Sequence, residues 1–236
     1  DEASLRDEDK WILTKLDAMT AAVAKSIESY NFNEAAAELY QFFWMNFCDW
    51  YVELIKERRF AADGKEAALA TAGYVLEKAL IPIHPFMPFV TEHIWQALTG
   101  NDLAGGDSIM CCAYPAQEYA FHREAESMDE VIELIGLIRN IRGEYNVNPG
   151  QLLTAVILTD SDFHRGLFTE KQDIIKRIAR LESFSFMAEA PDAAASQVHP
   201  HYTVYVPLSG LVDIQAELAK LNKELKGLEK DYNLYS

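Results

Sequence analysis

Residues 80–98 read LIPIHPFMPFVTEHIWQAL and set prolines at positions 82, 85 and 88 of a helix-rich chain. Proline has no backbone N–H and clashes with the preceding helical turn, but the first turn of a helix tolerates it. We therefore expect Pro82 and Pro85 to end one helix and hold an extended corner. Pro88 is expected to start the next helix, with Gly100 just past its end. Three apolar side chains are expected to pin the corner to the core: Phe86, Met87 and Phe89.

Apolar residues recur every three or four positions on both sides of this corner, which predicts helices. We expect Asp7 to cap the first helix and Asn33 to cap the second. The predicted helical segments are residues 7–30, 31–59, 64–81 and 88–98. The first half of the chain is therefore predicted to be an antiparallel helix bundle. Residues 108–115 are predicted to form a short strand after it.

The second half changes character, because β-branched and alternating runs appear between helical ones. Helices are predicted at residues 128–146 and 169–181, and strands at residues 151–159, 183–190 and 201–208. The predicted fold class is thus mainly α: a helix bundle over residues 1–120, a small α/β domain over residues 121–209, and a final helical arm.

The arm over residues 210–236 shows an apolar heptad pattern, which is typical of a coiled coil. The pattern consists of Leu211, Ile214, Leu218, Leu221, Leu225, Leu228, Tyr232 and Tyr235. Such a helix needs a partner, so we expect either a dimer or a second arm beyond this sequence.

Composition limits the classes of function. The formal net charge is −16 and both halves are acidic, which argues against bulk attraction to nucleic acid. No apolar run approaches the roughly 18 residues of a membrane span, and the acidic start is unlike a secretory signal. The three cysteines are at positions 48, 111 and 112 and include no Cys-x-x-Cys, so we expect a reducing, cytoplasmic location and no zinc site.

Candidate catalytic groups do not converge. His84 and His93 flank the proline corner without a third metal ligand at suitable spacing, so hydrogen bonding within the corner is the favoured interpretation. Cys48 has no histidine nearby in the sequence, and there is no glycine-rich phosphate loop. The sequence therefore predicts no catalytic residue, no metal and no cofactor in this chain.

Basic residues near aromatic ones are the features that fit RNA, since such pairs hold unpaired bases. Lys56, Arg58 and Arg59 form a dense basic cluster in an acidic half. Arg139 and Arg142 lie three residues apart on one predicted helix face.

Several segments resemble the anticodon-binding domain of class I aminoacyl-tRNA synthetases. FNEAAAELYQFFWMNFCDWYVELIK followed by IPIHPFMPFVTEHIWQAL carries the resemblance, and FCDWYVELIK is similar to the valyl-tRNA synthetases in particular. LIRNIRGEYNVNPG resembles the unit that follows the bundle in those enzymes, and LVDIQAELAKLNKELKGLEK resembles the first arm of their coiled coil.

This resemblance implies a parent enzyme that joins valine to its tRNA using ATP and Mg²⁺, with catalytic and editing domains that this chain lacks. It implies that the chain binds the anticodon loop of valine tRNA and does not activate amino acids itself. The expected tRNA contacts are Lys10, Trp11, Lys15, Lys56, Arg58 and Arg59. The missing catalytic domain of the same chain is the second expected partner, and no membrane is involved.

Two alternatives remain at this stage. One is a helical scaffold that docks a protein through the heptad pattern. The other is the equivalent domain of an isoleucyl-tRNA synthetase, against which the FCDWY string and the lack of cysteine pairs argue.

Overall fold

The computed structural model describes residues 2–61, 63–101 and 106–207, together with Leu225. Two compact units are distinguished, residues 1–130 and residues 131–236, here called unit 1 and unit 2. Helix α6 (His122–Glu144) runs through the boundary between them. The boundary predicted near residue 120 therefore stays a prediction. The predicted coiled-coil arm lies outside the described residues except for Leu225.

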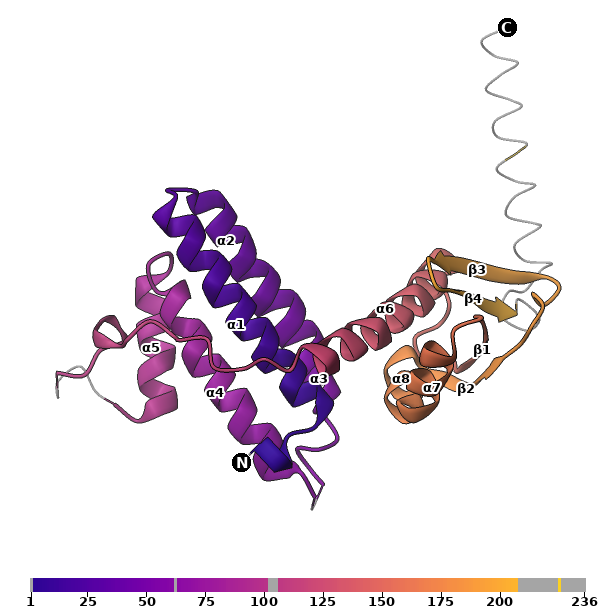
Figure 1. Cartoon of the computed structure of the whole chain (residues 1–236), viewed down its shortest axis with the longest axis horizontal. Coiled ribbons are helices and arrows are strands. Elements are labelled where there is room, and N and C mark those ends of the chain that lie inside the picture. The colour runs from indigo at the N-terminus through magenta and orange to yellow at the C-terminus, as the bar shows by residue number, and fades with distance from the viewer. Residues whose placement is uncertain (1, 62, 102–105, 208–224, 226–236) are drawn as a thin grey trace, which may run out of the picture. The chain divides into compact units, whose positions relative to one another are not determined.

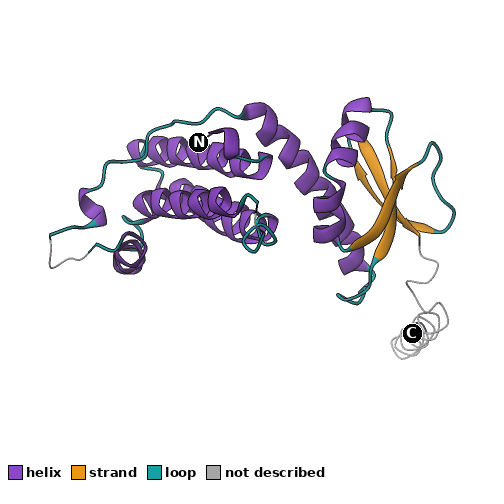
Figure 2. Ribbon diagram, turned by 90° about the horizontal axis from the view of Figure 1, so that it is seen from below, coloured by secondary structure: helices purple, strands orange, loops and turns teal. Residues whose placement is uncertain are grey.

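Among the described residues, unit 1 contains helices and loops, and the strands lie in unit 2 (Figure 2). The helices of unit 1 form the predicted bundle (Figure 1). Their bounds are Glu2–Ser4 (η1), Asp7–Glu28 (α1), Phe32–Tyr40 (α2), Gln41–Tyr51 (η2, a wide π-type segment), Val52–Leu54 (α3), Lys65–Ile83 (α4), Pro88–Thr99 (α5) and Ile109–Cys111 (η4).

Helix α1 supplies the centre of the bundle. Most of its apolar stripe is buried, although Ile27 near its end is only half-buried. Trp11, Ile12 and Val23 have no exposed surface. Burial of such a stripe against neighbouring helices is the main source of stability for an amphipathic helix. Facing it, the core contains Leu39, Phe42, Tyr51, Val75 and Ala79.

The predicted helix caps were each misplaced. Helix α1 has Arg6 rather than Asp7 as its N-cap, and the Asp9 carboxylate accepts the backbone N–H of Arg6 at 2.9 Å. Helix α2 begins at Phe32 rather than after Asn33, because the carbonyl of Asn31 already accepts the N–H of Ala35. The predicted helix over residues 31–59 ends at Leu54, and successive turns follow it.

The proline corner differs from the prediction at its first proline. Helix α4 continues through Pro82 to Ile83, because a proline in the last turn removes only one of the final helical hydrogen bonds. Residues 84–86 then form turns rather than an extended corner. Pro88 does start α5, and Gly100 closes it with a φ of 74°, as predicted.

Three side chains expected to pin this corner lie at the surface instead. Phe86, Met87 and Phe89 are 36 %, 54 % and 91 % exposed. The corner is held by polar contacts, because His84 Nδ1 lies 2.7 Å from Thr91 Oγ1 and that hydroxyl bonds the carbonyl of Met87 at 2.8 Å. The predicted local hydrogen bonding of His84 is thus present.

The prediction of a strand at residues 108–115 is wrong. Residues Ile109–Cys111 form a single 3-10 turn, and the hydroxyl of Ser108 accepts the N–H of Met110. No neighbouring strand is described in unit 1 for this segment to pair with, so its apolar Ile109 packs into the helical core against Leu80 and Trp95.

Unit 2 contains a mixed sheet in the order β2-β1-β4-β3. Strand β1 pairs in parallel with β2, and β4 pairs antiparallel with both β1 and β3. The bounds are Leu153–Leu158 (β1), Asp162–Glu170 (α7), Gln172–Ala179 (α8), Leu181–Phe186 (β2), Ala194–His199 (β3) and Tyr202–Pro207 (β4). The three predicted strands of this unit are confirmed, whereas α7 and β3 were not predicted.

The core of unit 2 lies between the sheet and its helices. Its fully buried members are Val131, Leu134, Ile135 and Ile138 of α6, Phe168 and Ile175 of α7 and α8, and Ile157, Val204 and Val206 of the strands. No helix among the described residues is long and apolar enough to cross a membrane.

Candidate nucleic-acid interface

The three predicted contacts on α1 are bound to the first part of α6. Lys10 Nζ lies 2.8 Å from Glu124, and Lys15 Nζ lies 2.7 Å from Asp129. The hydrogen bond from Lys10 lowers the pKa of Glu124. Trp11 donates its indole N–H to Asp129 at 2.8 Å, and its ring is fully buried. These residues therefore fasten α6 to the bundle.

Arg58 is the centre of a buried ionic cluster. Its Nη1 lies 2.7 Å from Glu8, and its Nη2 lies 2.8 Å from Asp9. The hydroxyl of Tyr51 donates to the other oxygen of Asp9 at 2.8 Å. Burial lowers the pKa of Arg58, but the bonds and charges of Asp9 and Glu8 outweigh it and raise that pKa. Arg58 thus connects the turns that follow α3 to the first turn of α1.

Gly64 allows this cluster to close. Its φ is +76°, and an added Cβ would lie 3.1 Å from Arg6 Nη2 and 3.3 Å from Arg58 Nε. Glycine is the residue that accepts both the left-handed conformation and this close approach.

Lys56 and Arg59 lie at the same end of the bundle, on its surface side. Lys56 is exposed and makes a weak ion pair with Glu53 at 3.2 Å. The guanidinium of Arg59 lies 5.2 Å from the ring centre of Phe60, and Phe60 is 82 % exposed. The buried Nε of Arg59 has no hydrogen-bond partner among the described residues.

A surface pocket of about 920 Å³ adjoins Phe60. Arg6, Asp63 and Lys65 lie in its wall, and Arg6 pairs with Asp63 at 2.9 Å. Asp63 and Glu66 balance the charges of Arg6 and Lys65, so the hollow is polar rather than basic. A polar hollow beside an exposed aromatic ring has features that hold an unpaired base. None of the six predicted contacts lines this hollow. Arg59 lies against Phe60 in its wall, Lys56 is exposed on the preceding turn, and Arg58 is buried in its ion cluster. Lys10, Trp11 and Lys15 are bound to α6.

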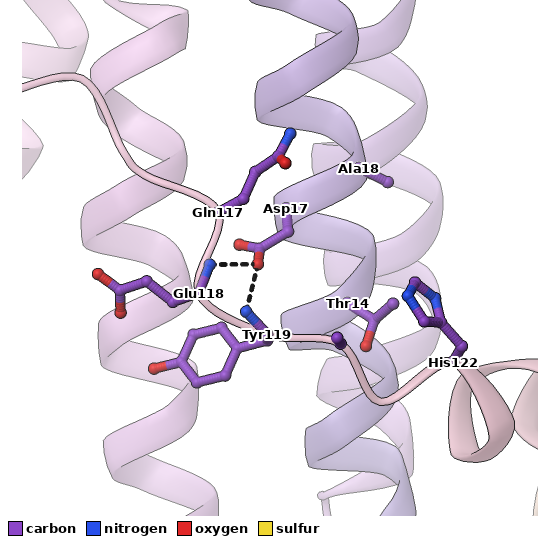
Figure 3. A pocket seen from close by; sticks show the side chains of 8 residues that line it. Thr14, Asp17, Ala18, Gln117, Glu118, Tyr119 and His122 are labelled. Carbon is purple, nitrogen blue, oxygen red and sulfur yellow. Dashed lines mark hydrogen bonds between the residues drawn. The ribbon is translucent and has the colours of Figure 1, made fainter.

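A second hollow of about 410 Å³ lies between α1 and the segment that leads into α6 (Figure 3). Asp17 forms its floor, and one oxygen of Asp17 accepts the backbone N–H groups of Glu118 and Tyr119 at 2.7 and 2.6 Å. Tyr114 adds a bond to the carbonyl of Thr20. The hollow is therefore the seam where the segment is clamped to the bundle.

Asp17 gives this clamp a pH dependence. Burial raises its pKa above the ordinary value of 3.8, although the two backbone N–H groups oppose the shift. The folded state then keeps a proton that the unfolded state loses, so the contribution of Asp17 to stability is full below pH 3.8 and falls as pH rises through the folded-state pKa.

We expect Asp17→Asn to gain stability relative to the native chain as the pH rises through the folded-state pKa of Asp17, because asparagine carries no charge. Urea titrations of both proteins between pH 3.5 and about 7 measure the difference, and a pH-independent difference would contradict it.

Several aromatic side chains of unit 1 are exposed, although sequence patterns did not single out Phe60. Phe60 is one of them, and a stacked pair, Tyr40 and Trp44, is 63 % and 51 % exposed. For Phe60 the basic residues before it were the available signal.

Sequence comparisons identify relatives of this chain. The family model for the anticodon-binding domain of tRNA ligase matches residues 9–157, which is more than half of the chain. A valine–tRNA ligase of Nitratidesulfovibrio vulgaris is 42 % identical over 231 residues, covering 94 % of this chain and 26 % of the relative. A valine–tRNA ligase of Syntrophotalea carbinolica is 40 % identical over 242 residues, covering 100 % of this chain and 27 % of the relative.

A valine–tRNA ligase of Aquifex aeolicus is 35 % identical over 247 residues, covering 97 % of this chain and 21 % of the relative. The chain thus spans about a quarter of the length of the relatives it matches. The match to the family model includes the bundle, α6 and most of β1.

Proposed function

The chain belongs to the family of anticodon-binding domains of tRNA ligases, and from this premise we propose that it is the anticodon-binding part of a valine–tRNA ligase. The observation that carries the proposal is the family match over the bundle, joined to relatives that are named valine–tRNA ligases. Its ligand is valine tRNA, bound at the anticodon loop. Its place is the cytoplasm, where reducing conditions keep cysteines such as Cys48 free.

The basic end of the bundle is the part of unit 1 that we assign to the anticodon loop. Single-stranded RNA is recognised when bases splay out onto aromatic rings and basic side chains. Phe60, Arg59 and Lys56 offer such groups beside a polar hollow. Lys10, Trp11, Lys15 and Arg58 support this end through their bonds within the bundle.

The chemistry belongs to the remainder of the ligase in this proposal. We place ATP, Mg²⁺ and the joining of valine to tRNA there, since this chain corresponds to about a quarter of its relatives. The exposed apolar residues of α5 and the preceding turn are the surface available to that remainder. They include Met87 and Val90, which line a groove with Tyr40 and Phe43, and the exposed Phe89. Large exposed apolar patches mark interaction sites.

Titration of the chain with valine tRNA at low salt tests the proposal. Valine codons share the bases G and U at their first two positions, so recognition must read the anticodon bases that pair with them and ignore the wobble base. We expect a Kd of about 10⁻⁴–10⁻⁶ M, as for salt-sensitive contacts. A change at the central anticodon base should weaken binding at least tenfold, and a wobble change should leave it within about twofold. Equal binding of all three tRNAs would contradict the proposal.

A further inference from the structure

The basic side chains of unit 2 gather at the C-terminal ends of two helices. Five of the seven lysines and arginines in residues 131–207 lie on α6, on α8 or directly after α8. Arg139 and Arg142 are on the last turns of α6, Arg177 is on the last turn of α8, and Arg180 follows it. These four arginines are called the arginine end.

Backbone contacts hold the arginine end together. Arg139 Nη2 donates to the carbonyl of Ile178 at 3.3 Å. Arg142 donates to the carbonyls of Gln151 and Asn148 at 3.0 Å each, and to that of Arg180 at 3.5 Å. These hydrogen bonds join the C-terminal end of α6, the turn after it and the C-terminal end of α8.

The charge of Arg142 is not cancelled by an acidic partner. Its hydrogen bonds all go to neutral carbonyls, and no ion pair joins Arg142 or Arg180 to a carboxylate among the described residues. Burial first, and then the nearby charge of Arg180, lowers the pKa of Arg142. Two like charges are therefore held close in a protein whose net charge is −16.

Clustered guanidinium groups fit phosphate. Their planar N–H forks match phosphate oxygens, and they pair with them as strong, charge-assisted hydrogen bonds. A polyanion is repelled by the chain as a whole and attracted where positive charge is concentrated. Tyr145, 40 % exposed, lies directly after α6 and adds an aromatic face to the same turn. RNA is favoured over an acidic protein because the match to the tRNA ligase family runs through Arg139 and Arg142.

We propose that the arginine end binds the phosphate backbone of the tRNA whose anticodon loop unit 1 holds. This inference rests on the proposed function and adds to it a contact that carries affinity without base specificity. Phosphate contacts position a nucleic acid, whereas base contacts specify it. The arginine end should then raise the affinity for every tRNA by the same factor.

The test combines Arg177→Gln with Arg180→Asn in the full chain. Arg180 has a φ of 57°, and asparagine accepts that conformation while removing the charge. Arg139 and Arg142 are left in place because they hold backbone carbonyls. Lys25→Gln with Lys78→Gln on unit 1 is the control, since it changes the net charge equally. Thermal unfolding of all three proteins verifies that they fold alike.

Binding is measured against salt concentration with valine tRNA and with its central-base variant. Each lost phosphate contact should lower the slope of log K against log salt by about 0.7–0.9. We expect the arginine variant to lose about 1.5 from the slope and about tenfold in low-salt affinity, equally for both tRNAs. The control should stay within about twofold.

The outcomes separate this inference from the proposed function. An unchanged slope with intact anticodon discrimination overturns the arginine end alone. A lower slope without discrimination supports the arginine end and overturns the anticodon proposal. The absence of tRNA binding overturns both.

Discussion

Replacement of Arg58 by methionine is expected to cost about 3–5 kcal/mol of unfolding free energy, because it leaves two buried carboxylates without their cation. Glu8 and Asp9 are 5 % and 0 % exposed, and both accept hydrogen bonds from Arg58. Methionine fills a similar volume, so lost charge pairing rather than a cavity decides the result. Urea unfolding followed by circular dichroism measures the loss.

The same experiment contains its own control. Lys56→Met removes a cation two positions earlier that is exposed and weakly paired, and it should change stability by less than about 0.5 kcal/mol. Adding Asp9→Asn and Glu8→Gln to Arg58→Met should restore part of the stability, because the uncompensated charges are gone. If Arg58→Met and Lys56→Met cost the same, the cluster does not stabilise the bundle.

Arg58 illustrates a contact that the sequence alone could not predict. A run of basic residues identified the cluster, but the pattern could not reveal that Asp9, far away in the chain, would pair with its middle member. Along the turns after Leu54, Lys56 is exposed, Arg59 is half-buried and Arg58 is buried. Local sequence therefore identified the run of basic residues, and packing decided which of its charges face outward.

The fold was predictable wherever periodicity was strong. The amphipathic pattern of α1 and the alternation of β4 each predicted an element and its buried face. Strand β3 was missed because Ala194–His199 has few β-branched or aromatic residues, and it becomes a strand through its pairing with β4. The Pro82 prediction failed because a proline in the last helical turn removes only one hydrogen bond, so α4 continues to Ile83.

Replacement of Trp11 by alanine is the second large expected effect, a loss of about 3–5 kcal/mol. The ring has no exposed surface, and its N–H bonds Asp129 at 2.8 Å. Truncation therefore opens a cavity in the bundle and removes a bond to α6. Trp11→Phe keeps most of the ring and loses the N–H donor, so it should cost about 1–3 kcal/mol, while Lys15 still pairs with Asp129.

Trp11→Phe also tests the role of Trp11 in RNA binding. A fully buried ring reaches RNA only through the structure it supports, so Trp11→Phe should leave tRNA affinity within about twofold wherever the protein stays folded. Filter binding at 15 °C, with folding checked by near-ultraviolet circular dichroism, makes the comparison. A larger loss of affinity in folded Trp11→Phe would mean that the indole touches a base after α6 moves aside. The contact between Trp11 and Asp129 would then be one that tRNA has to break.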